Sequence, residues 1–437
     1  MLSAFGVDLR IAALNLLQHR RRSLLLGGAL ACVTALFVLL SALTAGVRDT
    51  MVRNSTSLEC GHVNIGGFFK ITAGQGAPLV TRYREIMELV RKEVPELDYA
   101  VPRGRGMAKL IGPAGSVWSG VTSLDVANEP AFRAALRIEA GSLDDLAKPD
   151  ALLLFRTQAD KLGVKPGDVV TASAPTSGGV NNVVDLTVVA IARDLGMMSQ
   201  FSSFVSTAAL NSLYRISADA TGVVLVYLKD IGKSQAVAER MRGALLKAGW
   251  KLMDYDPNPF WMKFDKVNRE GWTGQKLDIT TWKDELTFMD WVFTALDAIT
   301  LILVVILLGI AVAGIMNVMW IAIRERTREI GTMRALGVQR RQILRMFLLE
   351  SLLLGFAGAA AGGLAATVLS WIVTALHIPV PVVVQLFLLS DRLILIVKPG
   401  TLLLAVAGIT AVTGLAALYP ALRAAKLKPV TAMGHAG

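Results

Sequence analysis

Four long apolar stretches alternate with polar segments along the 437-residue chain. A transmembrane helix needs about 20 consecutive apolar residues, because it rises about 1.5 Å per residue across a hydrocarbon core of about 30 Å. The hydrophobic pattern predicts spanning helices within 23–46, 284–323, 346–375 and 400–420. The second stretch is longer than a bilayer requires, so we expect it to rise above the membrane as a stalk.

A polar region, residues 47–283, separates the first two predicted spans. Its hydrophobic periodicity favours a strand–helix–strand unit at each end: strand 62–65, helix 81–94 and strand 99–111, then strand 222–228, helix 234–248 and a strand that starts at 250–253. Between these units lies an insert, about 112–215, that is rich in predicted strands. We therefore expect an α-helical membrane protein with four transmembrane helices and a large α+β domain inserted between helices 1 and 2.

The positively charged segments beside the spans predict the topology. Arg20, Arg21 and Arg22 precede the first span, where residues 1–22 are expected to carry an interfacial helix, and the loop 324–345 is rich in arginine. Because Lys and Arg concentrate on the cytoplasmic side, these segments and the tail 421–437 are placed in the cytoplasm, with both termini inside. Residues 47–283 and the loop 376–399 then lie outside. A cleaved signal peptide remains an alternative for the first span.

Composition and charge support a membrane protein and exclude nucleic-acid binding. The chain is 53% hydrophobic with a net charge of +11. Residues 47–289 hold 29 Lys and Arg against 27 Asp and Glu, so the large polar region is almost neutral. The basic surplus flanks the apolar stretches, as membrane topology requires, and forms no separate basic surface.

The chain contains no recognisable catalytic, cofactor or metal motif. Its only Gly-Lys-Ser, residues 232–234, has Tyr227 where a phosphate-binding loop requires glycine. The four histidines are scattered, and Cys32 and Cys60 are separated by the end of the first span, so neither a metal site nor a disulfide is expected. An enzyme that works alone is improbable.

The loop 324–345 predicts a short amphipathic helix. Ile330, Met333 and Leu336 recur every three residues on one face, and Gly337 stands where a helix C′ glycine belongs. Two interpretations are open: a solvated connector or membrane-surface anchor, and a docking helix whose apolar face fills a groove on a partner protein.

A family resemblance favours the docking helix. The run ERTREIGTMRALG at 325–337, preceded by GIMNVM at 314–319 and followed by Glu350, resembles FtsX/MacB-type ABC transporter permeases, including lipoprotein-releasing subunits. Segments 120–129 and 159–168 resemble the MacB-like periplasmic core domain more loosely. The resemblance implies that the loop is a coupling helix with these ATPase contacts: Glu329, Ile330, Gly331, Met333, Arg334, Leu336 and Gly337.

The resemblance also implies partners and a function. It predicts a non-catalytic permease subunit in the inner membrane, with ATP bound by a separate ABC ATPase and a second permease copy, identical or different. It also allows a periplasmic adaptor or acceptor protein. Motion of the ATPase would reach the extracytoplasmic domain, to extrude or extract a lipoprotein, lipid, peptide or drug. An FtsX-like regulator of an extracytoplasmic enzyme is the alternative, and a membrane-anchored enzyme is a third.

Several polar and small residues in the predicted spans have two interpretations each. Gly355, Gly358 and Gly362 permit close helix packing, either in a dimer interface or within the chain. Asp297, at the outer end of the second span, is read as a hydrated residue in preference to a proton relay. Glu350 is read as a structural residue at the interface.

Overall fold

The computed structural model divides into two compact units, which are described separately. It describes residues 10–12, 14–18, 20–72, 74–176, 179–196, 198–376 and 392–426. We call the described residues of the unit up to Arg48 and from Val292 onward the helical unit, and residues 49–291 the sheet unit. The predicted outer loop 376–399 and tail 421–437 fall largely outside the described residues.

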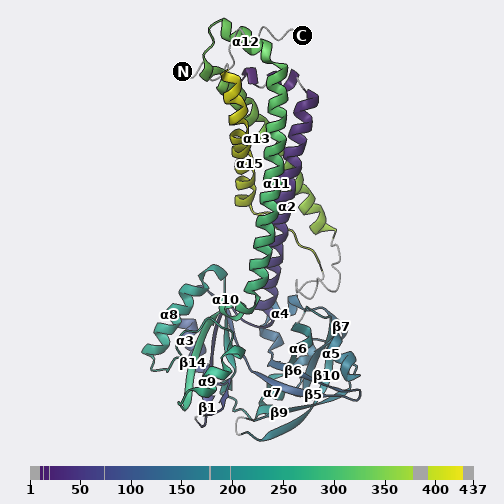
Figure 1. The fold of residues 1–437 in the computed structure, drawn as a ribbon. Helices are drawn as coiled ribbons and strands as arrows, with labels where there is room; N and C mark the ends of the chain where they lie inside the picture. Colours follow the sequence, from purple (N-terminus) through teal and green to yellow (C-terminus); the bar gives the residue numbers. More distant parts are fainter. Residues whose placement is uncertain are drawn as a thin grey trace. The chain divides into compact units, whose positions relative to one another are not determined.

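The helical unit is built from four long helices and one short helix (Figure 1). They are α2 (Arg20–Leu58), α11 (Asp290–Glu325), α12 (Thr327–Ala335), α13 (Arg340–Ala375) and α15 (Pro399–Ala425). The long helices are apolar enough to cross a membrane, which confirms the prediction of four spanning helices. Residues 49–58 of α2 and 290–291 of α11 are assigned to the sheet unit. Residues 10–12 and 14–18 are also helical.

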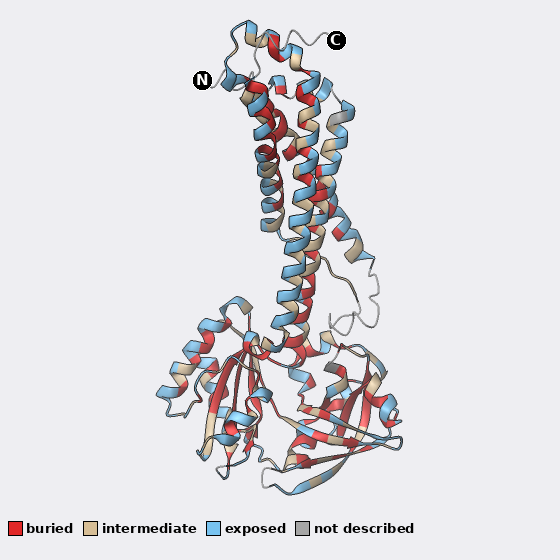
Figure 2. Cartoon of the chain, in the orientation of Figure 1, coloured by how far each residue is buried: buried red, intermediate tan, exposed pale blue. Residues whose placement is uncertain are grey.

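Small residues let the helices of this unit approach closely. A Cβ added to Gly355 would lie 2.8 Å from Thr413 of α15, and a Cβ on Gly358 would lie 2.8 Å from the Gly27 carbonyl of α2. Gly362 faces the carbonyl of Ala31 in the same way. The three glycines therefore pack within the chain. Buried residues lie along the helix faces that meet other helices of this unit (Figure 2). Large apolar residues such as Leu301, Trp371 and Leu403 are exposed, as expected for surfaces that contact lipid.

One half of the sheet unit is a five-stranded antiparallel sheet formed by the two ends of this sequence region. Its strand order is β14-β1-β13-β4, and β2 pairs with β1. Its strands are β1 (Val63–Lys70), β2 (Gly76–Ala77), β4 (Leu97–Arg103), β13 (Val223–Leu228) and β14 (Gly274–Thr281). The apolar faces of α3 (Tyr83–Glu93) and α8 (Ser234–Lys247) pack on it through Ile86, Val90, Val237 and Met241. The prediction of a strand that starts at 250–253 is wrong. In this segment only Leu252 pairs, through a single bridge to Leu277, and the strand that completes the sheet is β14.

The second half is a seven-stranded sheet with the order β7-β10-β8-β11-β6-β5-β9. Its strands are β5 (Arg105–Ile111), β6 (Ser116–Ser123), β7 (Ile138–Gly141), β8 (Ala151–Phe155), β9 (Val169–Pro175), β10 (Asn181–Ala192) and β11 (Ser202–Val205). Because β9 also pairs with β10, the sheet closes into a small barrel around a core that includes Leu110, Val121 and Leu152.

Short elements complete the sheet unit. They are the paired strands β3 (Val80–Thr81) and β12 (Ala220–Thr221), and the helices α4 (Pro130–Ala135), α5 (Arg156–Leu162), α6 (Met198–Phe201), α7 (Thr207–Tyr214), α9 (Phe264–Arg269) and α10 (Trp282–Glu285).

The predicted strand 99–111 is in fact two strands in different sheets. β4 ends at Arg103 and β5 begins at Arg105, so the chain leaves one sheet and enters the other at Gly104. The Gly104 N–H donates to the Ser123 hydroxyl at 2.7 Å, and a Cβ there would overlap the side chain of Leu210. The run Arg103-Gly104-Arg105-Gly106 interrupts the apolar pattern at this change of sheet.

Candidate functional site

The short helix α12 lies between two spanning helices and is the candidate functional site. It follows α11 after Arg326 and ends at Ala335 in a C-terminal turn that closes on Gly337. The Val338 N–H donates to the Met333 carbonyl at 3.0 Å, and the Gly337 N–H donates to the Arg334 carbonyl at 3.2 Å. This pattern is a Schellman motif, which requires a positive φ at the C′ residue, and Gly337 has φ +91. The predicted role of Gly337 in ending the helix is confirmed.

One face of α12 packs against the rest of the helical unit. Ile330 is completely buried in a cluster that includes Ile343, Ala421 and Ala424, and Gly331 is buried beside it. Met333 is half buried against the same cluster. Most of the apolar stripe seen in the sequence therefore holds the helix on its own chain.

The opposite face of α12 is exposed. Its exposed residues occur at helical spacing: Arg328, Glu329, Thr332, Ala335 and Leu336. Leu336, which directly follows the last residue of α12, has 80% of its surface accessible.

The seven predicted docking residues thus divide between the two faces. Glu329, Leu336 and Gly337 are exposed, whereas the structure corrects the placement of Ile330 and Gly331, which face inward. Arg334 is half buried and donates to the Val338 carbonyl at 3.0 Å, so it supports the C-terminal turn.

Sequence reasoning missed Arg328, Thr332 and Ala335 on the exposed face. These three residues are spaced by four and then three positions, which places them on one face of a helix. The prediction considered only the apolar residues Ile330, Met333 and Leu336 and therefore did not include this face. Further exposed arginines follow on α13 at Arg340 and Arg341, so the surface around the exposed face is mainly basic.

A buried ion pair fixes the start of α12 to α13. Arg326, the residue before α12, donates from Nη1 to Glu350 Oε2 at 3.0 Å, and both side chains are at most 7% exposed. The Arg326 carbonyl also accepts the Ile330 N–H at 3.0 Å in the first turn of α12. Since a buried charge that loses its partner is strongly destabilising, the pair ties the direction of α12 to the position of α13. The predicted structural role of Glu350 agrees with this arrangement.

Aromatic side chains surround a cation at the same end of α11 and α15. Arg423 lies 5.5 Å from the Trp320 ring and 5.4 Å from the Tyr419 ring, and the two rings meet edge to face at 6.3 Å. Such amphipathic rings favour a membrane surface.

At the other end of the helical unit, a salt bridge joins α2 to α11. Arg48 donates to Asp297 at 3.0 Å and stacks 5.0 Å from the Phe293 ring. Thr44, one turn before Arg48 in α2, forms a hydrogen bond of 3.1 Å with Thr300, which lies one turn after Asp297 in α11. Asp297 is more than half exposed, so a surface ion pair explains it without a proton relay.

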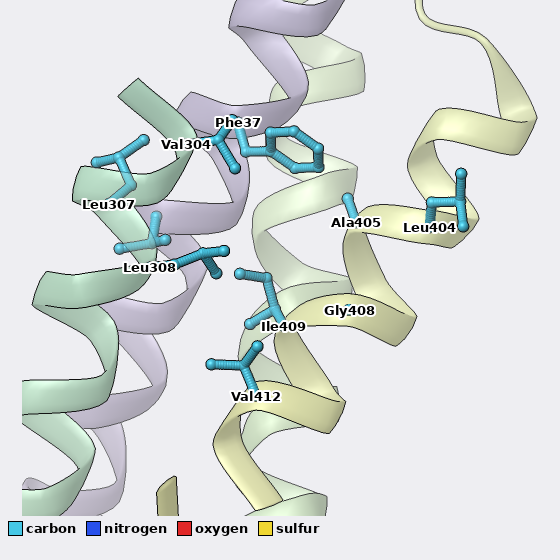
Figure 3. Close-up of a pocket in the computed structure, with 10 residues that line it drawn as sticks. Phe37, Val304, Leu307, Leu308, Leu404, Ala405, Gly408, Ile409 and Val412 are labelled. Carbon is cyan, nitrogen blue, oxygen red and sulfur yellow. The ribbon is translucent and has the colours of Figure 1, made fainter. Parts of the chain in front are cut away.

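An apolar cavity of about 160 Å³ lies between α2, α11 and α15 (Figure 3). Its lining carries no charged or hydrogen-bonding side chain: Val33, Phe37, Val304, Leu307, Leu308, Leu404, Ala405, Gly408, Ile409 and Val412. Such a cavity can admit an acyl chain or another apolar group, but it offers nothing to orient a charged ligand.

The sheet unit offers no phosphate-binding loop at its Gly-Lys-Ser segment. The Asp230 carboxylate accepts the Gly232 N–H at 2.9 Å and places a negative charge where a phosphate would bind. Across the described residues, no three His, Cys, Asp or Glu side chains gather in a way that could hold a metal ion.

Comparison with known proteins identifies the C-terminal part of the chain. Residues 301–429 match the family model of the FtsX-like permease C-terminal domain, a range that contains α12 and α13. The chain is 36% identical over 145 residues to the macrolide export ATP-binding/permease protein MacB of Syntrophobacter fumaroxidans, covering 32% of this chain and 18% of that protein. It is 34% identical over 122 residues to the uncharacterized ABC transporter permease YvrN of Bacillus subtilis, covering 28% and 26%.

Solved structures give a weaker likeness. The periplasmic region of MacB from Actinobacillus actinomycetemcomitans is 12% identical with a TM-score of 0.32, covering 54% of this chain and 96% of that one. The extracellular domain of the noncanonic ABC-type transporter YknZ is 14% identical with a TM-score of 0.30, covering 43% and 95%. The description of the fold therefore rests on the chain's own elements.

The matched segments cover about a quarter or less of the length of these curated relatives. The range matched by the family model contains α12, the ion pair partner Glu350 and the closely packed glycines of α13. Residues 301–429 therefore match the FtsX-like permease C-terminal domain, and the chain is similar to the permease proteins MacB and YvrN over about a third of its length.

Proposed function

We propose that this chain is the membrane subunit of an ABC transporter, and that a separate ATPase docks on the exposed face of α12. The observation that carries the proposal is the exposed Leu336 within a basic, family-matched segment that is itself anchored on the membrane helices. ATP is bound and hydrolysed by the partner, and this chain converts the motion of the partner into work outside the cytoplasm.

The anchoring of α12 supports transmission of that motion. α12 is held by the buried Ile330, and by the ion pair that links Arg326 to Glu350 of α13. A push on the exposed face therefore moves α13 with α12, because shifting one without the other would separate a buried charge pair. α11 precedes α12 directly and shares the same core, so it moves as well.

The sheet unit acts on the cargo. α2 and α11 both continue into segments of the sheet unit, so motion of either helix has a covalent route to it. The MacB and PvdT relatives carry names that describe macrolide and pyoverdine export. For this chain we propose extrusion or extraction of a lipoprotein, lipid, peptide or drug from the outer side of the membrane.

The assembly that we propose contains two permease copies and two ATPase subunits in the inner membrane. Four spanning helices are few for one transport unit, so a second permease, identical or different, completes it. The arginine-rich α12 segment faces the cytoplasm, as do both termini. A periplasmic adaptor or acceptor protein receives the cargo.

The experiment that tests the proposal is purification of the tagged chain from its native cell in mild detergent. An ATPase should co-purify with the wild-type chain and be lost with Leu336→Asp, since a carboxylate would be buried without a partner in the contact. The matched control is Leu246→Asp on α8, where the leucine is 55% exposed on a helix of the sheet unit. This control should retain the ATPase.

Two results would contradict the proposal. One is the absence of an ATPase from the wild-type complex. The other is equal recovery of the ATPase with Leu336→Asp and with the control. Recovery of an extracytoplasmic enzyme, together with an ATPase that drives no transport, would favour the FtsX-like regulator.

A further inference from the structure

The last turn of α2 is bound by buried side chains of the sheet unit. The final four carbonyls of a helix have no partner within the helix. In α2, the Ser55 carbonyl accepts the Glu59 N–H at 2.9 Å, and the Thr56 carbonyl accepts the Tyr227 hydroxyl at 3.0 Å. The remaining two carbonyls, of Ser57 and Leu58, accept hydrogen bonds from Arg103.

Arg103 contacts the helix end with two of its nitrogens. Nη1 donates to the Leu58 carbonyl at 2.6 Å, and Nη2 donates to the Ser57 carbonyl at 3.1 Å. A guanidinium at a helix C-terminus also interacts favourably with the negative end of the helix dipole. All four terminal carbonyls of α2 therefore have partners, and two of them depend on one side chain.

The same guanidinium forms an ion pair with a carboxylate that is equally buried. Arg103 donates from Nε to Glu129 Oε2 at 2.8 Å and also from Nη2 to the same oxygen, and both side chains are 1% exposed. The guanidinium lies 5.4 Å from the Phe132 ring. Burial would lower the pKa of Arg103, but Tyr227 and Glu129 outweigh it, so the pKa is raised and the side chain stays charged.

These contacts join three parts of the chain. Arg103 ends β4 of the five-stranded sheet, and Glu129 immediately precedes α4 on the other half of the sheet unit. Leu58 of α2 is buried in the cluster that contains Phe132 and Phe155. Arg103 thus connects the end of α2 to both halves of the sheet unit at once.

The segment after α2 provides no slack. Only Glu59 to His62 separate α2 from β1, and the Gly61 N–H donates to the Asn64 side chain at 2.7 Å. A Cβ at Gly61 would lie 2.9 Å from the Val226 nitrogen, so this backbone is packed tightly against β13. A hinge would need free backbone at this point, and the structure has bound and buried backbone instead.

Arg105, two residues further along the chain, is part of a second buried cluster. It stacks 3.5 Å from the Phe260 ring, and the Phe260 N–H donates to Glu285 Oε2 at 3.4 Å. Glu285 ends α10, shortly before α11 begins. The tripeptide 103–105 is therefore next to both chain segments that lead toward the spanning helices.

We infer that Arg103 is a positioning residue that makes the end of α2 a rigid joint with both halves of the sheet unit. Displacement or rotation of α2 is then delivered to both sheets together. This inference rests on the proposed function for its purpose, but the rigidity itself can be measured without a transport assay.

The first test is hydrogen exchange, followed by mass spectrometry, of the full-length chain in detergent or nanodiscs. The variant Arg103→Met should increase exchange of the amides of residues 57–61 by about tenfold, because the terminal carbonyls lose their donor and the turn frays. Tyr227→Phe removes one hydroxyl and keeps the ring, so a smaller increase is expected at the same amides. Arg133→Met is the matched control, since Arg133 forms an exposed pair with Asp144.

A folding defect is separated from the proposed effect by a paired variant. Arg103→Met leaves the Glu129 carboxylate buried without a partner, whereas Arg103→Met combined with Glu129→Gln removes both charges. If the paired variant protects the core strands like wild type but still exchanges faster at 57–61, the joint depends on Arg103. Wild-type exchange at 57–61 in the paired variant overturns the inference.

The second test uses the complex with the co-purifying ATPase, with and without ATP and vanadate, a mimic of the transferring phosphate. In wild type, nucleotide should change exchange in the sheet unit, and in the paired variant this change should be lost while ATP hydrolysis continues. If the paired variant keeps the change, the inference fails. If wild type shows no change beyond α2, the proposed function fails, and the first test still decides whether the joint is rigid.

Discussion

In the part of the chain that the structure describes, two buried arginine–glutamate pairs lie at helix ends, and their arginines differ in the number of hydrogen bonds that they donate. Arg103 donates from Nε, Nη1 and Nη2 to Glu129 and to the carbonyls of α2. Arg326 donates to Glu350 from Nη1, while its buried Nη2 has no hydrogen-bond partner within the described part of the chain. The first pair holds a helix end in place, whereas the second has an unused donor.

This difference fits the two positions in the proposed mechanism. α12 is nine residues long, exposed on one face, and must respond to a partner that binds and releases. The end of α2 must pass on whatever motion reaches it. A saturated buried network favours one geometry, whereas the Arg326–Glu350 pair holds α12 to α13 through one charge-assisted hydrogen bond.

The largest effect is expected from Arg103→Met. The free energy of unfolding should fall by about 3–5 kcal/mol, because Glu129 would remain as an unpaired buried charge. Pulse proteolysis of the full-length chain at increasing urea measures this loss. Arg133→Met should change stability by less than about 0.5 kcal/mol, as exposed pairs usually do. Equal losses for the two variants would show that burial does not distinguish the pairs.

A smaller loss is expected from Glu350→Gln. The amide can still accept a hydrogen bond from Arg326 but no longer balances its charge, so we expect a loss of about 1–3 kcal/mol. The same variant should reduce recovery of the ATPase, because the direction of α12 is no longer fixed. Unfolding monitored by proteolysis gives the first quantity, and affinity purification gives the second. Full ATPase recovery would mean that the pair only stabilises the fold.

A change of about 1 kcal/mol is expected for Gly337→Ala. Alanine at φ +91 is strained and weakens the turn that ends α12. Hydrogen exchange at residues 336–338 should increase. Gly309→Ala in α11 is the matched control, because a Cβ there meets no atom within 4 Å and alanine favours a helix. If both variants behave alike, the Schellman turn does not determine the end of α12.

The smallest expected effect is a dependence of stability on pH at Glu285. Burial raises the pKa of Glu285, against the opposing influence of Arg105. The folded state then holds a proton more tightly than the unfolded state, so this contribution is present below the unfolded pKa of about 4.3 and is lost as pH rises through the folded pKa. Melting temperatures of wild type and Glu285→Gln, measured from pH 4.5 to 7.5, should converge or cross as wild type loses stability. A constant difference would contradict the shift.

Local patterns in the sequence were sufficient for the spanning helices and for the end of α12. The lengths of the apolar stretches predicted the four helices, and Gly337 predicted the turn that ends α12. Each of these features depends on residues that are close together in the chain. The same reasoning placed Ile330 on a surface that meets a partner. The structure buries Ile330 against Ala421 and Ala424, which are about 90 residues away in sequence.

The contacts missed by sequence analysis all depend on tertiary structure. Arg103 and Glu129 belong to separate parts of the sheet unit, and neither stands out in a predicted strand or turn. The change of sheet at Gly104 depends on Leu210, which occupies the space of a side chain. Strand β14 pairs with β1 across some 200 residues, so local propensity at 250–253 could not reveal which segment completes the sheet.

The closure of the barrel has a consequence for association between molecules. Exposed strand edges invite pairing with foreign chains, and closure removes them. In the barrel half as described, the outer edge that remains belongs to β7, which is four residues long and ends at Gly141 with φ +79. An extended peptide that bound by adding a strand would find longer edges on β4 of the five-stranded sheet and on the part of β14 that the bridge from Leu252 to Leu277 leaves open. Aggregation through strand exchange, if the chain is crowded in a membrane, should likewise begin at those edges.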